Sequence, residues 1–160
     1  MLLDTRNMIN PANVVILVAE DSEDDRFMYR RALEKVGIKN VRFVPDGEEA
    51  IAYLRAEGKY ADRNEYPFPN WLILDLKMPR RGGFEVLQWV REHTECSVIP
   101  TIIMTSSMIP ADVKRAYEIG VNTFFSKPHS QAELVALFQG LLDYWCKAEI
   151  PPVPPSRKCE

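Results

Sequence analysis

The sequence predicts an α/β fold in which helices cover both faces of a parallel β-sheet. The prediction depends on apolar runs, on helical patterns that alternate with them, and on polar residues where the runs end. The clearest run, Trp71–Leu74, stops at Asp75 and is followed by Pro79. Four consecutive apolar residues are typical of a strand that is buried on both faces. Pro79 has no backbone N–H and should lie beyond the strand. Asp75 is therefore expected near the carboxyl end of a central strand, where open α/β sheets bind ligands.

The composition is that of one globular domain. The chain has 160 residues, of which 46% are hydrophobic and 27% charged, and its formal net charge is −3. It has no Lys/Arg run of the kind that marks a nucleic-acid-binding protein. No apolar run approaches the roughly 20 residues of a membrane span, and residues 1–12 carry polar residues where a signal peptide needs its apolar core. We therefore expect a cytoplasmic protein that binds neither nucleic acid nor membrane.

The cysteine pattern favours reduced thiols. Cys96, Cys146 and Cys159 are widely spaced, odd in number and free of any CxxC pairing. Both a disulfide framework and a zinc site are less consistent with this pattern than three free thiols are.

The first strand and helix are predicted from an apolar run and a cap. Val14–Ala19 is rich in β-branched residues, which favours a buried strand. Ser22, with Asp25 three residues later, gives a helix start that resembles a capping box. Gly37 is the kind of residue that ends such a helix.

The second strand and helix follow directly. Val41–Val44 is a short strand, and Asp46 can cap a helix that Gly58 would end. The next segment, Lys59–Asn70, contains two prolines and several charges. We predict an unusually long loop there, leading into the central strand.

The remaining elements continue the alternation of helices and strands after the central strand. They are a helix through Phe84–Arg91, a strand over Val98–Thr105, a helix over Pro110–Ile119 that ends at Gly120, a strand over Val121–Ser126, and a helix that Ser130 caps and that continues to Trp145. Pro100 is tolerable only near the start of its strand.

Five β-α repeats imply one domain with right-handed crossovers. We place this domain at residues 14–147, after an N-terminal extension over residues 1–13. The C-terminal segment, Ala148–Glu160, contains four prolines and few apolar anchors, so we predict a proline-rich extended tail.

Polar residues follow four of the predicted strands, and parallel strands bring such residues to one edge of the sheet. Glu20-Asp21 follows the first strand and Asp75 the third, while Thr105 ends the fourth and Lys127 follows the fifth. Crowded carboxylates repel each other and need a cation, and their hard oxygen ligands suit Mg²⁺. A lysine supplies a positive point charge and a threonine hydroxyl a hydrogen bond to an oxyanion. Together these groups could move a phosphoryl group onto a carboxylate.

These residues resemble the receiver domain of two-component response regulators over roughly Val14 to Trp145. The matching motifs are the acidic pair Glu20-Asp21, the acceptor segment Asp75-x-Lys-Met-Pro, the pair Thr105-Ser106 and the signature Lys127-Pro128. The resemblance implies a flavodoxin-like, doubly wound five-stranded sheet with strand order 2-1-3-4-5. It also implies a signalling switch, not an enzyme, that accepts a phosphoryl group from a sensor histidine kinase or phosphotransfer protein. Within the family, the long loop and the segment after Pro79 look most like stand-alone receivers, including those that serve phytochrome kinases.

The resemblance also assigns roles to individual residues. Mg²⁺ would be bound by the side chains of Glu20, Asp21 and Asp75 and by the backbone carbonyl of Lys77. Lys127 and Thr105 would contact the phosphoryl group on Asp75. Thr105 and Phe124 would form the switch: Thr105 moves toward the phosphate, and Phe124 turns inward to fill the space. Packing alone explains Phe124 equally well.

Two positions are expected to tune the lifetime of the phosphate, Lys77 and Ser107. Lys77 could hinder the attacking water or pair with the phosphate, which predicts slow dephosphorylation, whereas Ser107 leaves the direction open. At the end of the last helix, Tyr144 and Trp145 suit either core packing or a homodimer through the surface of the fourth helix, fifth strand and fifth helix. With no output domain predicted, the signal should pass to a downstream protein target by contact.

Two other functions are consistent with parts of the pattern. A phosphohydrolase that uses an aspartyl phosphate needs a carboxylate two residues after its nucleophile, and this chain has Lys77 there. A pseudo-receiver that only scaffolds partners typically lacks some of the acids or the lysine, and this chain has all of them.

Overall fold

The computed structural model of the protein describes residues 10–152 and 158–160. Most of the predicted extension over residues 1–13, and the centre of the predicted tail, lie outside the described residues. A single sheet of five strands forms the middle layer, in the order β2-β1-β3-β4-β5 and with every pair of neighbours parallel. The strands are β1 (Val15–Ala19), β2 (Asn40–Val44), β3 (Trp71–Leu74), β4 (Thr101–Thr105) and β5 (Thr123–Ser126). The predicted topology is confirmed.

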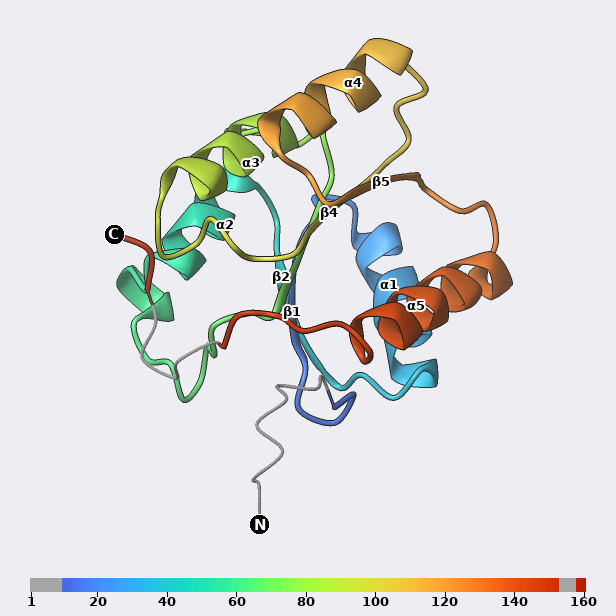
Figure 1. Cartoon of the computed structure of the whole chain (residues 1–160), viewed down its shortest axis with the longest axis horizontal. Coiled ribbons are helices and arrows are strands. Elements are labelled where there is room, and N and C mark those ends of the chain that lie inside the picture. Colours follow the sequence, from blue (N-terminus) through green and yellow to red (C-terminus); the bar gives the residue numbers. More distant parts are fainter. Residues whose placement is uncertain (1–9, 153–157) are drawn as a thin grey trace.

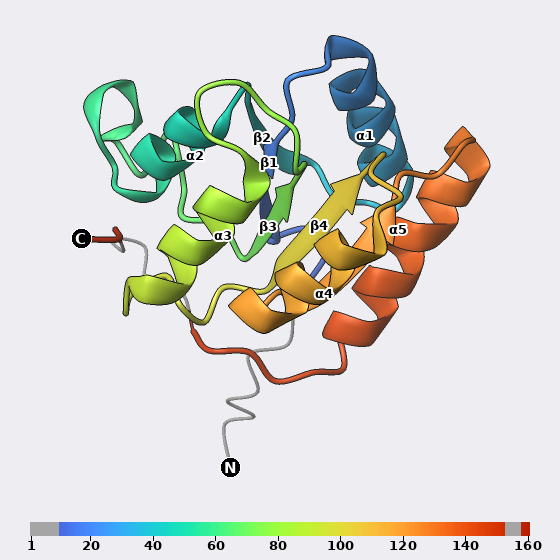
Figure 2. The same cartoon turned by 90° about the horizontal axis from the view of Figure 1, so that it is seen from above.

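Helices cover both faces of this sheet (Figures 1 and 2). They are α1 (Glu23–Lys35), α2 (Gly47–Leu54), α3 (Gly83–Glu92), α4 (Pro110–Ile119) and α5 (Gln131–Trp145), with a short 3₁₀ turn, η1 (Gly58–Tyr60). α1 and α5 pack on one face, while α2, α3 and α4 pack on the other. Among the described residues, no helix has the length and apolar character needed to cross a membrane.

The central strand β3 supplies side chains to two separate cores. Trp71 and Ile73 lie in the core beneath α1 and α5, whereas Leu72 and Leu74 lie in the core beneath α2, α3 and α4. This division follows from the period of two in a strand. All four residues are at most 1% exposed, which explains why the sequence shows an uninterrupted apolar run.

The predicted helix caps are present. The side chains of Ser22, Asp46 and Ser130 accept hydrogen bonds from backbone N–H groups three residues later, at 3.3, 2.9 and 3.2 Å. Each satisfies a donor that the helix itself leaves free, which contributes about 1 kcal/mol. After α4, Gly120 has a φ of 114°, which is a left-handed conformation that glycine adopts without strain.

Several element boundaries differ from prediction. β1 begins at Val15 and β2 at Asn40, each one residue from the predicted start. Three further boundaries also differ. β4 begins at Thr101, not Val98, because Pro100 has no N–H for the ladder; only its carbonyl takes part, accepting from Leu72 N at 2.9 Å. β5 begins at Thr123, not Val121. α2 ends at Leu54, before Gly58, because the chain turns at Ala56, whose φ is 54°. The carbonyls of Tyr53 and Leu54 then accept from groups outside the helix.

One of those groups is Arg63, which also orders the long loop. Its guanidinium donates to the carbonyls of Tyr53 and Leu54 at 2.9 Å each. The rings of Tyr60 and Tyr66 pack against Tyr53 and against each other, with centroids 5.1–6.0 Å apart. The predicted loop therefore holds η1 and an aromatic cluster that packs on the end of α2.

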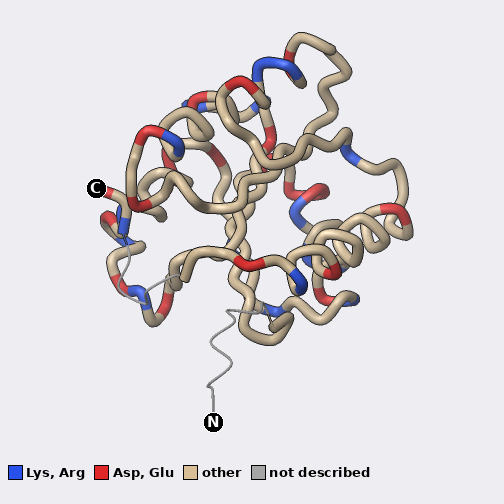
Figure 3. The backbone as a smooth tube through the Cα atoms, viewed as in Figure 1, with Lys and Arg blue, Asp and Glu red and all other residues tan. Residues whose placement is uncertain are grey.

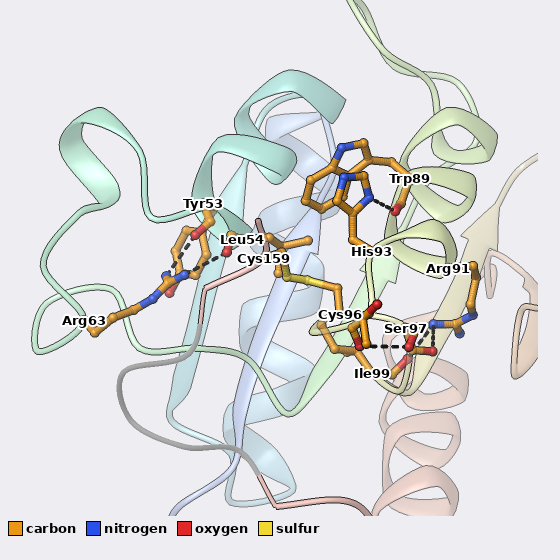
Figure 4. Close-up of a disulfide and its surroundings, with 11 residues drawn as sticks. Tyr53, Leu54, Arg63, Trp89, Arg91, His93, Cys96, Ser97, Ile99 and Cys159 are labelled. Carbon is orange, nitrogen blue, oxygen red and sulfur yellow. Dashed lines mark hydrogen bonds between the residues drawn. A yellow bond between two sulfur atoms is a disulfide. The ribbon is translucent and has the colours of Figure 1, made fainter.

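The cysteine prediction was wrong. Cys96, in the α3–β4 loop, forms a disulfide with Cys159, and their Cα atoms are 5.7 Å apart (Figure 4). The sequence did not reveal the pair because the partners are 63 residues apart and meet only when the C-terminal segment folds back. Cys146 is free.

The expectation of a tail with few anchors also needs correction. Ala148 and Ile150 pack against the core under α1 and α5, whereas Cys159 is fully buried in the core on the opposite face. The backbone N–H of Cys159 donates to the carbonyl of Leu54 at 2.9 Å. The C-terminus accordingly lies beside α2, across the sheet from α5 (Figure 1).

This geometry predicts a stability that depends on reductant. Closing a loop of 63 residues restricts the unfolded chain, so reduction should lower the free energy of unfolding by about 4 kcal/mol and the Tm by roughly 10 °C. Thermal unfolding with and without dithiothreitol measures the difference. Cys159→Ala should be insensitive to the reductant and Cys146→Ala as sensitive as the wild type. Equal Tm values for the wild type in both conditions would contradict the prediction.

Candidate functional site

Strand register brings the predicted acidic residues together at the carboxyl edge of the sheet. Ala19 pairs with Leu74 in neighbouring strands, so Glu20 and Asp75, the next residue in each, emerge side by side. The N–H of Asp75 donates to the carbonyl of Ala19 at 3.1 Å. One carboxylate oxygen from each of Glu20, Asp21 and Asp75 lies within 4.8 Å of the others. The predicted acidic cluster is thus present.

The surroundings of Glu20 disfavour its charged form. Its side chain is 1% exposed, and burial raises its pKa to about 7, against the lowering effects of Lys127 and of the N–H of Ser22. Oε1 accepts from Ser22 N at 3.1 Å, whereas Oε2 has no hydrogen-bond partner among the residues that the structure describes. Lys127 Nζ lies 2.9 Å from Oε2. The two groups form an ion pair, but their geometry does not meet the criteria for a hydrogen bond. A buried carboxylate oxygen in this state suits a divalent cation.

Lys127 is the cation that the protein itself supplies. It follows β5, where its backbone N–H donates to the carbonyl of Thr105 at 2.8 Å. Its Nζ lies 2.9 Å from Asp75 Oδ2 and 2.6 Å from Asp25 Oδ2. Burial alone would lower the pKa of Lys127, but the bonds to Asp25, Asp75 and Glu20 raise it above its ordinary value. The ammonium group is therefore a permanent charge beside Asp75.

Asp25 is the residue in this site that the sequence analysis missed. It was read only as part of the helix start, and its N–H does donate to Ser22 Oγ. Its side chain, however, extends from the first turn of α1 to Lys127 and accepts a hydrogen bond from it. The sequence could have indicated this role, because Asp25 lies one helical turn after the acidic pair and the N-terminus of its helix adjoins the strand ends.

The predicted hydroxyl and switch positions lie on β4 and β5. Thr105 is fully buried, and its Oγ1 accepts from Ser107 N at 3.2 Å. Ser107 Oγ donates to Asp112 Oδ2 at 2.6 Å, so this hydroxyl is engaged with the start of α4. Phe124 is half-buried and packs against the core beneath α2, α3 and α4. Thr105 is thus linked to α4 through Ser107, and Phe124 is linked to that core.

The loop after Asp75 is fixed by close contacts. The N–H of Lys77 lies 3.4 Å from Asp75 Oδ1, which keeps the Lys77 backbone next to the carboxylate. Arg80 donates through Nε, at 2.8 Å, and through Nη2 to Asp46 Oδ2, and it has a φ of 64°. At Gly83 a Cβ atom would collide with the Asp75 carbonyl. The loop conformation thus depends on an ion pair to the α2 cap and on a glycine.

Positive and negative residues are interspersed along the described chain, with no continuous basic stripe in the view of Figure 3. This distribution agrees with the absence of a Lys/Arg run in the sequence.

Comparisons with known proteins agree with this geometry. The family model of the response regulator receiver domain matches residues 16–139. Response regulator Rcp1 of Synechocystis sp. is 32% identical over 137 residues, which span 85% of this chain and 90% of Rcp1. The crystal structure of the phosphorylated cyanobacterial phytochrome response regulator RcpA has a TM-score of 0.79 at 30% identity, covering 88% of this chain and 100% of RcpA. That of the Mn²⁺-bound form of Rcp1 has a TM-score of 0.76 at 30% identity, covering 87% and 99%. The chain belongs to the receiver domains of two-component response regulators.

Proposed function

We propose that this receiver domain is a phosphorylation-controlled switch that takes a phosphoryl group on Asp75 and passes the signal on by protein contact. The observation that carries the proposal is the juxtaposition of the Glu20, Asp21 and Asp75 carboxylates within 4.8 Å, with Lys127 Nζ 2.9 Å from Asp75. A nucleophile, a site for a metal and a fixed cation are the groups that phosphoryl transfer to a carboxylate requires.

In the proposed reaction an oxygen of Asp75 attacks phosphorus, and the bond from phosphorus to the donor's histidine nitrogen breaks. Lys127 balances the charge that reaches Asp75, and the Thr105 hydroxyl donates to a phosphoryl oxygen. Bound Mg²⁺ would neutralise the carboxylates and the incoming oxygens. Glu20, Asp21, Asp75 and the carbonyl of Lys77 are the groups to hold it. The buried Oε2 of Glu20, which has no hydrogen-bond partner among the described residues, and the Mn²⁺-bound form of the related Rcp1 support a divalent metal.

The proposed conformational change after phosphorylation starts at Thr105. A phosphoryl group adds roughly −1.5 to −2 charge and three acceptor oxygens, which would draw the Thr105 hydroxyl toward Asp75. Phe124 would then turn inward. Thr105 is joined to α4 through Ser107 and Asp112, which supports a change in the surface around α4 and β5.

The proposed partners follow from this mechanism. The phosphoryl donor is a sensor histidine kinase or phosphotransfer protein in the cytoplasm, and the likeness to RcpA supports a phytochrome-type kinase. The α4–β5–α5 surface would take a downstream target or a second copy of the chain. Exposed Val113, Tyr117 and Tyr144 support an apolar contact there, whereas Trp145 is 7% exposed and belongs to the core.

Incubation with acetyl phosphate and Mg²⁺ should add the mass of one phosphoryl group. Asp75→Asn should abolish the addition because the nucleophilic oxygen is replaced, and EDTA should suppress it because the carboxylates are left uncompensated. Asp143→Asn, on the exposed side of α5, serves as the control and should react like the wild type. Intact-mass spectrometry reads out all four. A wild-type chain without added mass would leave the scaffold function standing.

The lifetime of the phosphate is expected to depend on Lys77. Its side chain is exposed and its N–H lies beside Asp75, so it can obstruct the attacking water or pair with the phosphate. Lys77→Asn should therefore speed the loss of the phosphoryl group, by roughly 3- to 10-fold if a surface ion pair of about 1 kcal/mol is lost. Decay of the added mass after removal of the donor gives the rate. Faster decay in the wild type than in Lys77→Asn would reverse the assignment.

A further inference from the structure

Asp25 holds the ammonium group of Lys127 more closely than the strand-end carboxylates do. The distance from Nζ is 2.6 Å to Asp25, against 2.9 Å to both Glu20 and Asp75. We propose that Asp25 is a positioning residue that competes with the phosphoryl group for Lys127 and so weakens the phosphoryl-bearing state. The inference rests on the proposed function and adds to it a regulatory carboxylate on α1.

The position of Asp25 is fixed by the start of α1. Ser22 caps the helix by accepting from the N–H of Asp25. One residue further on, Arg26 Nη1 donates to the carbonyl of Glu20 at 2.7 Å, which ties the first turn of α1 to the end of β1. The carboxylate of Asp25 is therefore presented to the site by rigid backbone.

Asp25 differs in role from the other acids around Lys127. Glu20 and Asp75 share the carboxylate cluster with Asp21, and that cluster does not include Asp25. A cation bound there would compensate Glu20 and Asp75 directly. Asp25 has only Lys127 as a charged partner within ion-pair distance among the described residues, so it retains its hold on the ammonium when a metal is bound.

The donors of Lys127 are limited. An ammonium group has three N–H donors, and three carboxylates already surround this one. A phosphoryl group on Asp75 needs at least one donor from Lys127, so it must share the ammonium with Asp25. It also brings further negative charge toward Asp25, and like charges a few ångströms apart repel.

The alternative is an ordinary surface ion pair, which has little effect. The Asp25 side chain is 36% exposed, but that of Lys127 is only 17% exposed. The same nitrogen contacts the acceptor carboxylate, so a change at Asp25 alters the charge that Lys127 presents to Asp75. This shared nitrogen is what distinguishes the pair from a solvated one.

Asp25→Asn tests the proposal because asparagine keeps the size and the backbone N–H but not the charge. We expect it to bind beryllofluoride, in the presence of Mg²⁺, roughly fivefold more tightly than the wild type, because one nearby like charge is removed and a donor of Lys127 is freed. Isothermal titration calorimetry gives the affinity. The rate of phosphorylation by acetyl phosphate, followed by intact mass, should rise in parallel.

Two matched variants separate a specific effect from a general one. Asp24→Asn removes the same charge from the adjacent, exposed residue and should leave the affinity within about twofold of the wild type, since exposed charges are screened. Asp25→Glu restores the carboxylate and should bind as the wild type does. A urea midpoint for each variant verifies the fold.

The outcomes are distinct. An unchanged or weaker affinity in Asp25→Asn, or an equal gain in Asp24→Asn, overturns the competition by Asp25 while the proposed function stands. A wild-type chain that binds no beryllofluoride overturns the proposed function and the role of Asp25 together.

Discussion

The site depends on a repulsion that the sheet itself imposes. The register of β1 against β3 sets Glu20 beside Asp75, and both side chains are buried. Two like charges in a poorly solvated place cannot both remain charged without a cation. Lys127 supplies part of that charge from the end of β5, beyond β3 and β4. The compensation is incomplete, because Oε2 of Glu20 has no hydrogen-bond partner among the described residues. The need for a further cation follows from this arrangement, and it is the basis for proposing Asp75 as the phosphoryl acceptor.

The sheet, the helices and the acidic cluster were predictable because their signals are local. Buried strands such as β3 give unbroken apolar runs, and caps such as Ser22 and Asp46 act within three residues. Parallel strands place their carboxyl ends on one edge, so Glu20, Asp75 and Lys127 could be brought together without knowing any distance. The boundaries were less certain: Pro100 delays the start of β4, and the chain turns at Ala56 just after the end of α2.

The disulfide and the role of Asp25 were not predictable, because each depends on two residues that are far apart in the sequence. Cys96 and Cys159 are separated by 63 residues, and Asp25 and Lys127 by 102. In both pairs, one member lies where a local explanation already sufficed: Asp25 in a helix start, Cys159 in a proline-rich segment. Because the local sequence already explained each of these residues, it gave no indication of a second role that depends on a distant residue.

The two long-range links lie at opposite ends of the sheet. The disulfide joins the C-terminus to the α3–β4 loop near Leu54, at the edge where strands begin (Figure 4), whereas Asp25, Asp75 and Lys127 meet at the edge where strands end. A cross-link stabilises chiefly by restricting the unfolded chain, so it need not touch the elements that move. The disulfide therefore places no direct constraint on the loops around Asp75 and Thr105, which are held by contacts of their own at the other edge. The cross-link and the proposed switch thus lie at different edges of one sheet.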